Sequence, residues 1–225
     1  MLNWSFVTPC KSQSTESDYF YVSTDGKEDL DIGIRMGVGV NTFAGNKLID
    51  PLPLLRFNGG IYHRIPITKN KVSLYYELSA SFKGARFNAS GDSAIERFAL
   101  TYFDLPVGLD YAFLYQESAV VDAKPLVLRG FIGLQPSLLL RSTMFLNAGD
   151  RQGRQFSLPF NTFDLALIAG VLYDFPIGYG KMGLSSFIKY GLVNIDKDLD
   201  FFKPDPNFSD GNFVNNLQIT FNISF

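Results

Sequence analysis

The sequence has little charge for its length. Charged residues make up 19% of the 225 residues, whereas hydrophobic residues make up 46% and aromatic residues 15%. A soluble protein normally has about 25% charged residues, so the deficit indicates that much of the surface does not face water. The net charge is −2 and no basic run follows a strand or helix. A nucleic-acid partner is therefore not expected.

Long hydrophobic runs are also missing. The longest apolar run extends from Leu165 to Tyr173, and a helix that crosses a bilayer needs roughly 20 apolar residues. The pattern therefore excludes helical membrane spans. Transmembrane strands need only about 9–11 residues, and half of their side chains face away from lipid, so hydropathy does not reveal them.

Cysteine and histidine each occur once, which limits the chemistry available. Cys10 has no partner for an internal disulfide, and any Ser-His-Asp or metal-histidine arrangement would need His63. Residue parity puts His63 on the outer face of a strand near Pro66, where an interfacial aromatic belt is the better interpretation. The acidic run that contains Asp196, Asp198 and Asp200 does not match a calcium loop, because it lacks the turn glycine and the later glutamate of that motif. We therefore expect no catalytic residues, no cofactor and no metal.

The clearest positive pattern is the last stretch of the chain, residues 217–225. Leu217, Ile219, Phe221, Ile223 and Phe225 alternate with uncharged polar residues. Period-two alternation indicates a strand with two different faces. A polar but uncharged face opposite large apolar side chains is typical of a strand between lipid and a crowded lumen. An ordinary sandwich strand is the alternative.

The same alternation recurs along the chain and predicts eight strands, at about 31–42, 55–65, 72–83, 101–113, 126–140, 163–175, 184–192 and 217–225. The connections after the first, third, fifth and seventh strands are long, including polar loops at 84–100, 141–160 and 194–212, and the others are shorter. This predicts an all-β, eight-stranded antiparallel up-and-down transmembrane β-barrel over residues 31–225. Residues 1–30 show no period and are expected to form a polar periplasmic tail.

Two prolines and one rival fold qualify this prediction. Pro106 and Pro136 lie inside predicted strands, where a closed barrel has no free edge, so we expect a β-bulge at each. The rival is a soluble lipocalin-like barrel, which turns its apolar face inward. In the membrane barrel, the faces that point toward lipid contain Ile34, Leu78, Leu109, Leu134, Leu167 and Ile219.

Charged residues of both signs fall on the predicted inner face. Because a desolvated, unpaired charge in a narrow lumen is costly, these charges should pair with one another or with trapped water. Glu77 and Asp104 should each lie within salt-bridge reach of a cation, and the filled lumen should not conduct. The predicted lumenal polar network consists of Arg35, Arg64, Glu77, Lys83, Asp104, Asp110, Arg129, Asp164, Asp174 and Lys189.

Three segments also resemble a known family. The chain is similar to the PorT-like outer-membrane β-barrel proteins of Bacteroidetes in residues 102–109 (YFDLPVGL), 183–195 (GLSSFIKYGLVNI) and 77–85 (ELSASFKGA), and in the closing Phe225. The resemblance covers about residues 31–225 and implies a barrel in the outer membrane, with a link to secretion machinery. It implies no particular activity, and residues 1–30 have no counterpart in it.

We infer the expected function by elimination, and we assign it to the outer surfaces of the barrel and its loops. We expect a non-enzymatic structural or accessory component of an envelope complex, in contact with outer-membrane lipid and other envelope proteins; the alternative is an outer-membrane enzyme or a small-molecule or lipid-binding barrel. Loops on a rigid scaffold are common binding sites, and Phe201, Phe202 and Phe208 mark a partner-docking loop.

The two ends of the chain carry expectations about export and assembly. The alternating last strand, with Phe221, Ile223 and Phe225, resembles the C-terminal signal for outer-membrane assembly machinery. The N-terminus lacks signal-peptide features, so an export signal is presumed removed or the start truncated.

Overall fold

The computed structural model describes residues 31–45, 51–68, 71–88, 95–116, 125–146, 154–156, 160–177, 180–195 and 214–225. The strands are β1 (Asp31–Gly45), β2 (Leu54–Thr68), β3 (Val72–Lys83), β4 (Arg86–Asn88), β5 (Ile95–Asp104), β6 (Val107–Gln116), β7 (Leu126–Leu146), β8 (Arg154–Phe156), β9 (Phe163–Ile177), β10 (Gly180–Gly191) and β11 (Val214–Ser224).

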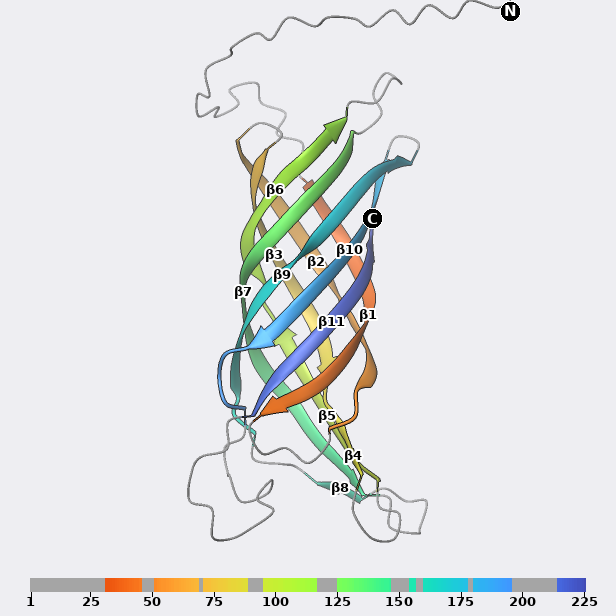
Figure 1. The fold of residues 1–225 in the computed structure, drawn as a ribbon, viewed down its shortest axis with the longest axis vertical. Coiled ribbons are helices and arrows are strands. Elements are labelled where there is room, and N and C mark those ends of the chain that lie inside the picture. Colours follow the sequence, from red (N-terminus) through yellow and green to blue (C-terminus); the bar gives the residue numbers. More distant parts are fainter. Residues whose placement is uncertain are drawn as a thin grey trace, which may run out of the picture.

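The strands form a closed antiparallel barrel (Figure 1). Each long strand pairs with its neighbour along the chain, and β11 closes the wall by pairing with β1. Strands β5 and β6 are consecutive halves of one wall strand, because both pair with β3 and with β7. With the short β4 and β8 set aside, eight strands make up the wall, which confirms the predicted fold class.

The apolar faces of the strands point outward. Ile34, Leu78, Leu109, Leu134, Leu167 and Ile219 are between 40% and 54% exposed. The side chains that alternate with them are buried, and most of these are polar, such as Arg35, Glu77 and Asp110. A lipocalin-like barrel has the opposite arrangement, so this rival fold is excluded. The alternation is therefore that of a strand between lipid and a filled lumen. The described residues contain no helix that is long and apolar enough to cross a membrane.

Two predicted loops are partly strands. The loop expected at 84–100 contains β4 and the first half of β5, and the loop expected at 141–160 contains the end of β7 and β8. The reason is that the polarity of the pattern inverts here: Phe98 and Leu100 are buried at 1% exposure, while Arg141 on the neighbouring strand is exposed. Figure 1 shows these strands extending past the rest of the wall, at the end opposite the C-terminus.

The two prolines share one break in the wall. Pro106 lies in the interruption between β5 and β6, and the bulge expected there is absent, because Asp104 opposite Ser137 and Val107 opposite Leu134 keep one register. The bulge expected at Pro136 is absent, because Gln135, Pro136 and Ser137 pair with β9 without a shift in register. The Pro136 carbonyl accepts a hydrogen bond from the Leu105 N–H at 2.9 Å. In an antiparallel strand, the N–H and C=O of a residue point to the same neighbour, so the missing N–H of Pro136 faces the break.

The barrel interior is layered along its axis. One apolar cluster fills the middle and consists of Tyr62, Tyr75, Phe131, Ile168, Leu172 and Phe187. A second closes the end that carries the long connections and consists of Phe43, Ala85, Phe98, Leu100, Tyr102, Phe160 and Ile195. Polar side chains lie between the two clusters and on the far side of the first. This layering fixes the environment of every lumenal charge.

Candidate functional site

The first polar layer lies at the end of the barrel where β1 begins. The Arg64 guanidinium contacts three carboxylates, with distances of 2.9 Å to Asp31, 2.7 Å to Asp110 and 3.0 Å to Asp174. Arg129 contacts Asp110 at 2.9 Å and lies 3.8 Å from Asp174. Each of the two buried aspartates thus bridges two arginines.

This layer joins strands that are distant in sequence. Asp31 also pairs with Lys181, on β10. Three carboxylates and three cations therefore neutralise one another across β1, β2, β6, β7, β9 and β10. Since a buried pair with both partners present leaves no uncompensated charge, the layer closes this end of the lumen at no net charge.

The second group lies against the central apolar cluster. Arg35 pairs with Glu77, and the Tyr75 hydroxyl donates a hydrogen bond to the same Glu77 carboxylate. The Arg35 guanidinium also lies over the Phe187 ring, 4.5 Å from its centroid, and 5.6 Å from the centroid of the Tyr75 ring. A desolvated cation against aromatic faces gains from the ring quadrupole, so this pair is embedded in the aromatic layer.

The third group lies between the two apolar clusters. Lys83 Nζ is 3.1 Å from Asp164 and 3.8 Å from Asp104, and the Asn216 amide donates to Asp164 at 3.1 Å. Lys189 is 4% exposed. Its charge is attracted by Asp104 and repelled by Lys83, yet no carboxylate in the described part of the chain forms an ion pair with it.

All ten side chains of the predicted lumenal network are placed inside the barrel, each at 9% exposure or less. The structure distributes them over the three groups described above. The sequence prediction omitted Asp31 and Lys181, which complete the first layer. Residue parity carries the signal for both, since Asp31 alternates in phase with Arg35, and Lys181 with Ser185.

The lumenal groups offer little reactive chemistry. Asp31, Glu77, Asp104, Asp110, Asp164 and Asp174 each form at least one ion pair. Over the described ranges, no group of three or more His, Cys, Asp and Glu side chains is suited to hold a metal ion. His63 lies on the outer wall, where its Nδ1 and the Tyr76 hydroxyl are 2.6 Å apart. It is thus separated from the lumenal carboxylates by the wall.

Of the predicted surface sites, the C-terminal strand is described. Phe221, Ile223 and Phe225 lie on the outer wall at 59%, 44% and 58% exposure. The Phe225 N–H donates to the Ile34 carbonyl at 2.9 Å, and the Ile34 N–H donates back at 3.0 Å. The chain end is thus held in the wall. The other predicted features lie outside the described residues: Phe201, Phe202, Phe208, Cys10, the tail at 1–30 and the acidic run at 196–200.

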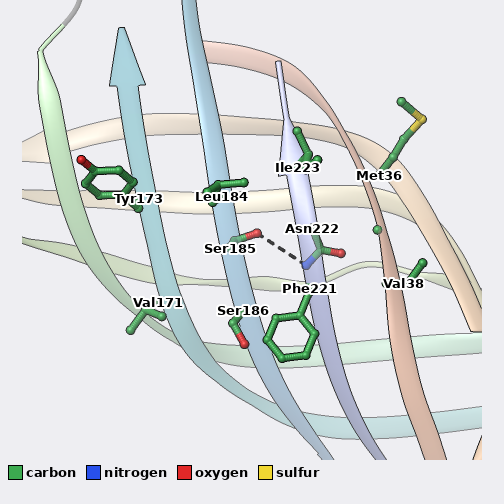
Figure 2. Close-up of a pocket in the computed structure, with 11 residues that line it drawn as sticks. Met36, Val38, Val171, Tyr173, Leu184, Ser185, Ser186, Phe221, Asn222 and Ile223 are labelled. Atoms are coloured by element: carbon green, nitrogen blue, oxygen red, sulfur yellow. Dashed lines mark hydrogen bonds between the residues drawn. The ribbon is translucent and has the colours of Figure 1, made fainter. Parts of the chain in front are cut away.

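The described part of the outer wall carries a hollow that the alternation in the sequence does not predict. It has a volume of about 550 Å³ and lies over β1, β9, β10 and β11 (Figure 2). The register explains it: Val171, Ser186, Phe221 and Val38 form one row across the four strands. Ser186 is the small residue in that row of otherwise large outward side chains. The hollow is therefore a shallow, largely apolar depression in the lipid-facing wall.

Comparison with solved structures identifies similar barrels at low identity. Two crystal structures of Ail, the attachment invasion locus protein of Yersinia pestis, are similar to this chain, one in complex with the heparin analogue sucrose octasulfate. They share 13% and 12% identity and TM-scores of 0.39 and 0.38, and each comparison covers 86% of this chain and 97% of Ail. No curated protein matches the sequence.

The comparison with family models gives a match over most of the chain. The model of the outer membrane protein beta-barrel domain matches residues 12–197, which include strands β1 to β10. The outward apolar faces and the polar side chains of the lumen are features of barrels in the bacterial outer membrane. The chain belongs to the outer membrane protein beta-barrel domain family.

Proposed function

We propose that the protein is a non-enzymatic structural or accessory component of an envelope complex, which docks other envelope proteins through the connections at one end of the barrel. The observation that supports this most directly is the lumen. Its described carboxylates are all engaged in ion pairs, and its middle is filled by aromatic side chains. Neither a conduit nor an open active site is available there, which leaves the surfaces to act.

The distribution of connections supports docking at one end. At the end where β1 begins, the connections between wall strands are 69–71, 117–125 and 178–179. At the other end they are 46–53, 84–94, 147–162 and 192–213, with β4 and β8 inside two of them. Long connections on a rigid scaffold are common binding surfaces. We propose that this end faces the cell exterior and that both chain termini are periplasmic.

The proposal includes a finer family assignment. The resemblance of three segments to PorT-like proteins of Bacteroidetes suggests a secretion or outer-membrane assembly complex as the partner. Within the 192–213 connection, Phe201, Phe202 and Phe208 are the proposed contacts, because exposed aromatic side chains are costly unless another surface covers them.

Affinity isolation from gently solubilised membranes tests this proposal. The variant Phe201→Ala, Phe202→Ala, Phe208→Ala is compared with the matched control Lys203→Ala, Asp205→Ala, Asn207→Ala in the same connection. We expect proteins that co-purify in stoichiometric amounts with the wild type to be retained by the control and lost from the phenylalanine variant. A solitary barrel in the wild-type preparation contradicts the proposal.

A lipid-binding barrel is the second candidate, and the hollow around Ser186 is the observation that favours it. Its lining is mainly apolar and faces the membrane, so an acyl chain is the chemistry it would accept. Mass spectrometry of the barrel in mild detergent distinguishes the candidates: a lipid retained by the wild type and lost on Ser186→Phe, which fills the hollow, favours this second function.

A further inference from the structure

Three arginines gather at the extension of the wall beyond β3, where β4 pairs with the first half of β5 (Figure 1). Arg86 on β4 and Arg97 on β5 are directly opposite one another, so their side chains lie on the same face of the sheet. Arg97 also lies close enough to Arg56, on β2, to act on it electrostatically. Because like charges on opposite residues destabilise a sheet, this arginine cluster favours a nearby negative charge.

Arg56 lies in an irregular part of the wall. The ladder between β2 and β3 ends at Asn58, and the two sides pair again at the bridge between Leu52 and Arg86. Between these points the Arg56 guanidinium reaches across to β5 and donates a hydrogen bond of 3.4 Å to the Phe98 carbonyl. Its Nε is buried and has no hydrogen-bond partner in the described part of the chain. Arg56 therefore has an unsatisfied donor at this point of the wall.

The backbone between β3 and β4 approaches β5 closely at Gly84. Its φ is +143°, and a Cβ at this position would lie 2.0 Å from the Phe98 carbonyl oxygen. Residues with a side chain rarely adopt this backbone conformation. The Phe98 N–H donates in turn to the Ala85 carbonyl at 2.9 Å. Glycine thus allows the close pairing of β4 with β5 that sets Arg86 opposite Arg97.

The negative charge does not come from the described carboxylates. None of them forms an ion pair with Arg56 or Arg86. Asp104 and Asp164, in the third polar group, lie inside the lumen and pair with Lys83. Arg86 is exposed on the outside of the wall. An anion that approaches from outside the barrel can therefore reach the cluster.

The depth of the cluster relative to the apolar wall specifies a lipid headgroup. Leu55 and Phe57, on either side of Arg56, are 65% and 67% exposed. Phe82, at 43% exposure, is the last large apolar side chain on the outward face of β3, and Arg86 follows four residues later. Four residues of a tilted strand rise about 9 Å, and the headgroup layer is roughly 5–8 Å thick. The cluster therefore begins at the edge of the apolar wall and extends through headgroup depth.

We propose that Arg56, Arg86 and Arg97 form a binding site for the phosphate group of an anionic membrane lipid. Guanidinium groups match phosphate oxygens in geometry as well as in charge, and the acyl chains of the same lipid cover the apolar side chains beside the cluster. A lipid satisfies both features, whereas a soluble polyanion satisfies only the first. The inference is independent of the proposed docking function, of the orientation of the barrel and of the hollow over β1, β9, β10 and β11.

Native mass spectrometry of the full chain in a neutral detergent tests the proposal, with phosphatidic acid and phosphatidylcholine titrated separately. We expect the wild type to bind phosphatidic acid in preference to phosphatidylcholine. Arg86→Gln should lower the affinity for phosphatidic acid about tenfold or more, because a hydrogen bond to a charged group is lost. Equal binding of the two lipids by the wild type overturns the proposal, as does an unchanged affinity in Arg86→Gln.

Arg141→Gln is the matched control, since Arg141 is an exposed arginine of the same wall extension that lies opposite Thr101, outside the cluster. We expect it to leave the affinity for phosphatidic acid nearly unchanged. Equal losses in Arg86→Gln and Arg141→Gln would show diffuse attraction to positive charge and would overturn the site. Inorganic phosphate or a soluble polyphosphate that binds the wild type as tightly as phosphatidic acid would also overturn it, because the site would then take a soluble anion.

Discussion

Asp110 connects two arginines on different strands, so one carboxylate holds three strands together. Its Oδ2 lies 2.7 Å from Arg64 Nε, and its Oδ1 lies 2.9 Å from Arg129 Nη1. The side chain is fully buried. Removing one partner of a buried ion pair leaves the other charge desolvated, which costs more than the pair itself contributes. The stability of this end of the barrel therefore depends on keeping the set complete.

We predict that Asp110→Ala lowers the free energy of unfolding by about 3–5 kcal/mol, because both arginines lose a buried counter-charge. Urea unfolding in detergent micelles, followed by circular dichroism, measures the change. The control is Ser73→Ala, which removes only a 3.4 Å hydrogen bond from Arg129 and should cost about 1 kcal/mol. Equal losses in the two variants would show that the ion pairs contribute nothing specific.

At the scale of the strand, alternation in the sequence was sufficient to predict the eight wall strands and their lipid-facing sides. It failed at the extensions of β5 and β7, because beyond the lipid the inner residues Phe98 and Leu100 are apolar and the outer residues are polar. The individual ion pairs could not be predicted either. Arg64 and Asp174 are far apart in sequence, and which lumenal residues meet across a narrow barrel depends on strand tilt and stagger.

The break shared by the two prolines leads to a prediction about β7. Pro136→Ala should change the free energy of unfolding by no more than about 1 kcal/mol, because the Leu105 N–H already donates to the Pro136 carbonyl and the restored N–H can add only the second hydrogen bond of this pair, to the Leu105 carbonyl. Ile132→Pro is the matched control, since Ile132 points to the same face of the same strand and pairs with Leu109. It should cost about 3 kcal/mol or more. Urea unfolding of both variants decides the matter.

The chain end of β11 leads to a prediction about assembly. Deletion of Phe225 should reduce the folded fraction in cells, because the proposed signal for the assembly machinery ends on this aromatic side chain, whereas Phe225→Tyr keeps the ring and should assemble normally. Heat-dependent mobility on gels measures the folded fraction. Refolding of the purified deletion variant in detergent separates recognition from stability: if that variant also fails to refold, the loss reflects the missing pairing with Ile34 rather than a signal.

At the scale of the whole molecule, the layered lumen determines what can pass through the barrel. An interior enclosed by eight strands is only wide enough for side chains. The central and end apolar clusters fill this interior, and the side chains of both clusters are buried. We predict that the purified protein gives no single-channel steps in planar bilayers. Sizeable currents from the purified barrel, absent from an empty-detergent control, would contradict this interpretation of the lumen.

The arrangement of the chain ends allows a direct test of orientation. The first residue of β1 and the C-terminus lie toward the same end of the barrel (Figure 1), and the connection at 192–213 joins strands at the other end. If the termini are periplasmic, as we propose, the single cysteine, Cys10, is a natural probe. A membrane-impermeant maleimide should label Cys10 only after the outer membrane is permeabilised, whereas Ser209→Cys in a Cys10→Ser background should be labelled in intact cells. Labelling of Cys10 in intact cells would reverse the orientation and move the docking surface to the periplasm.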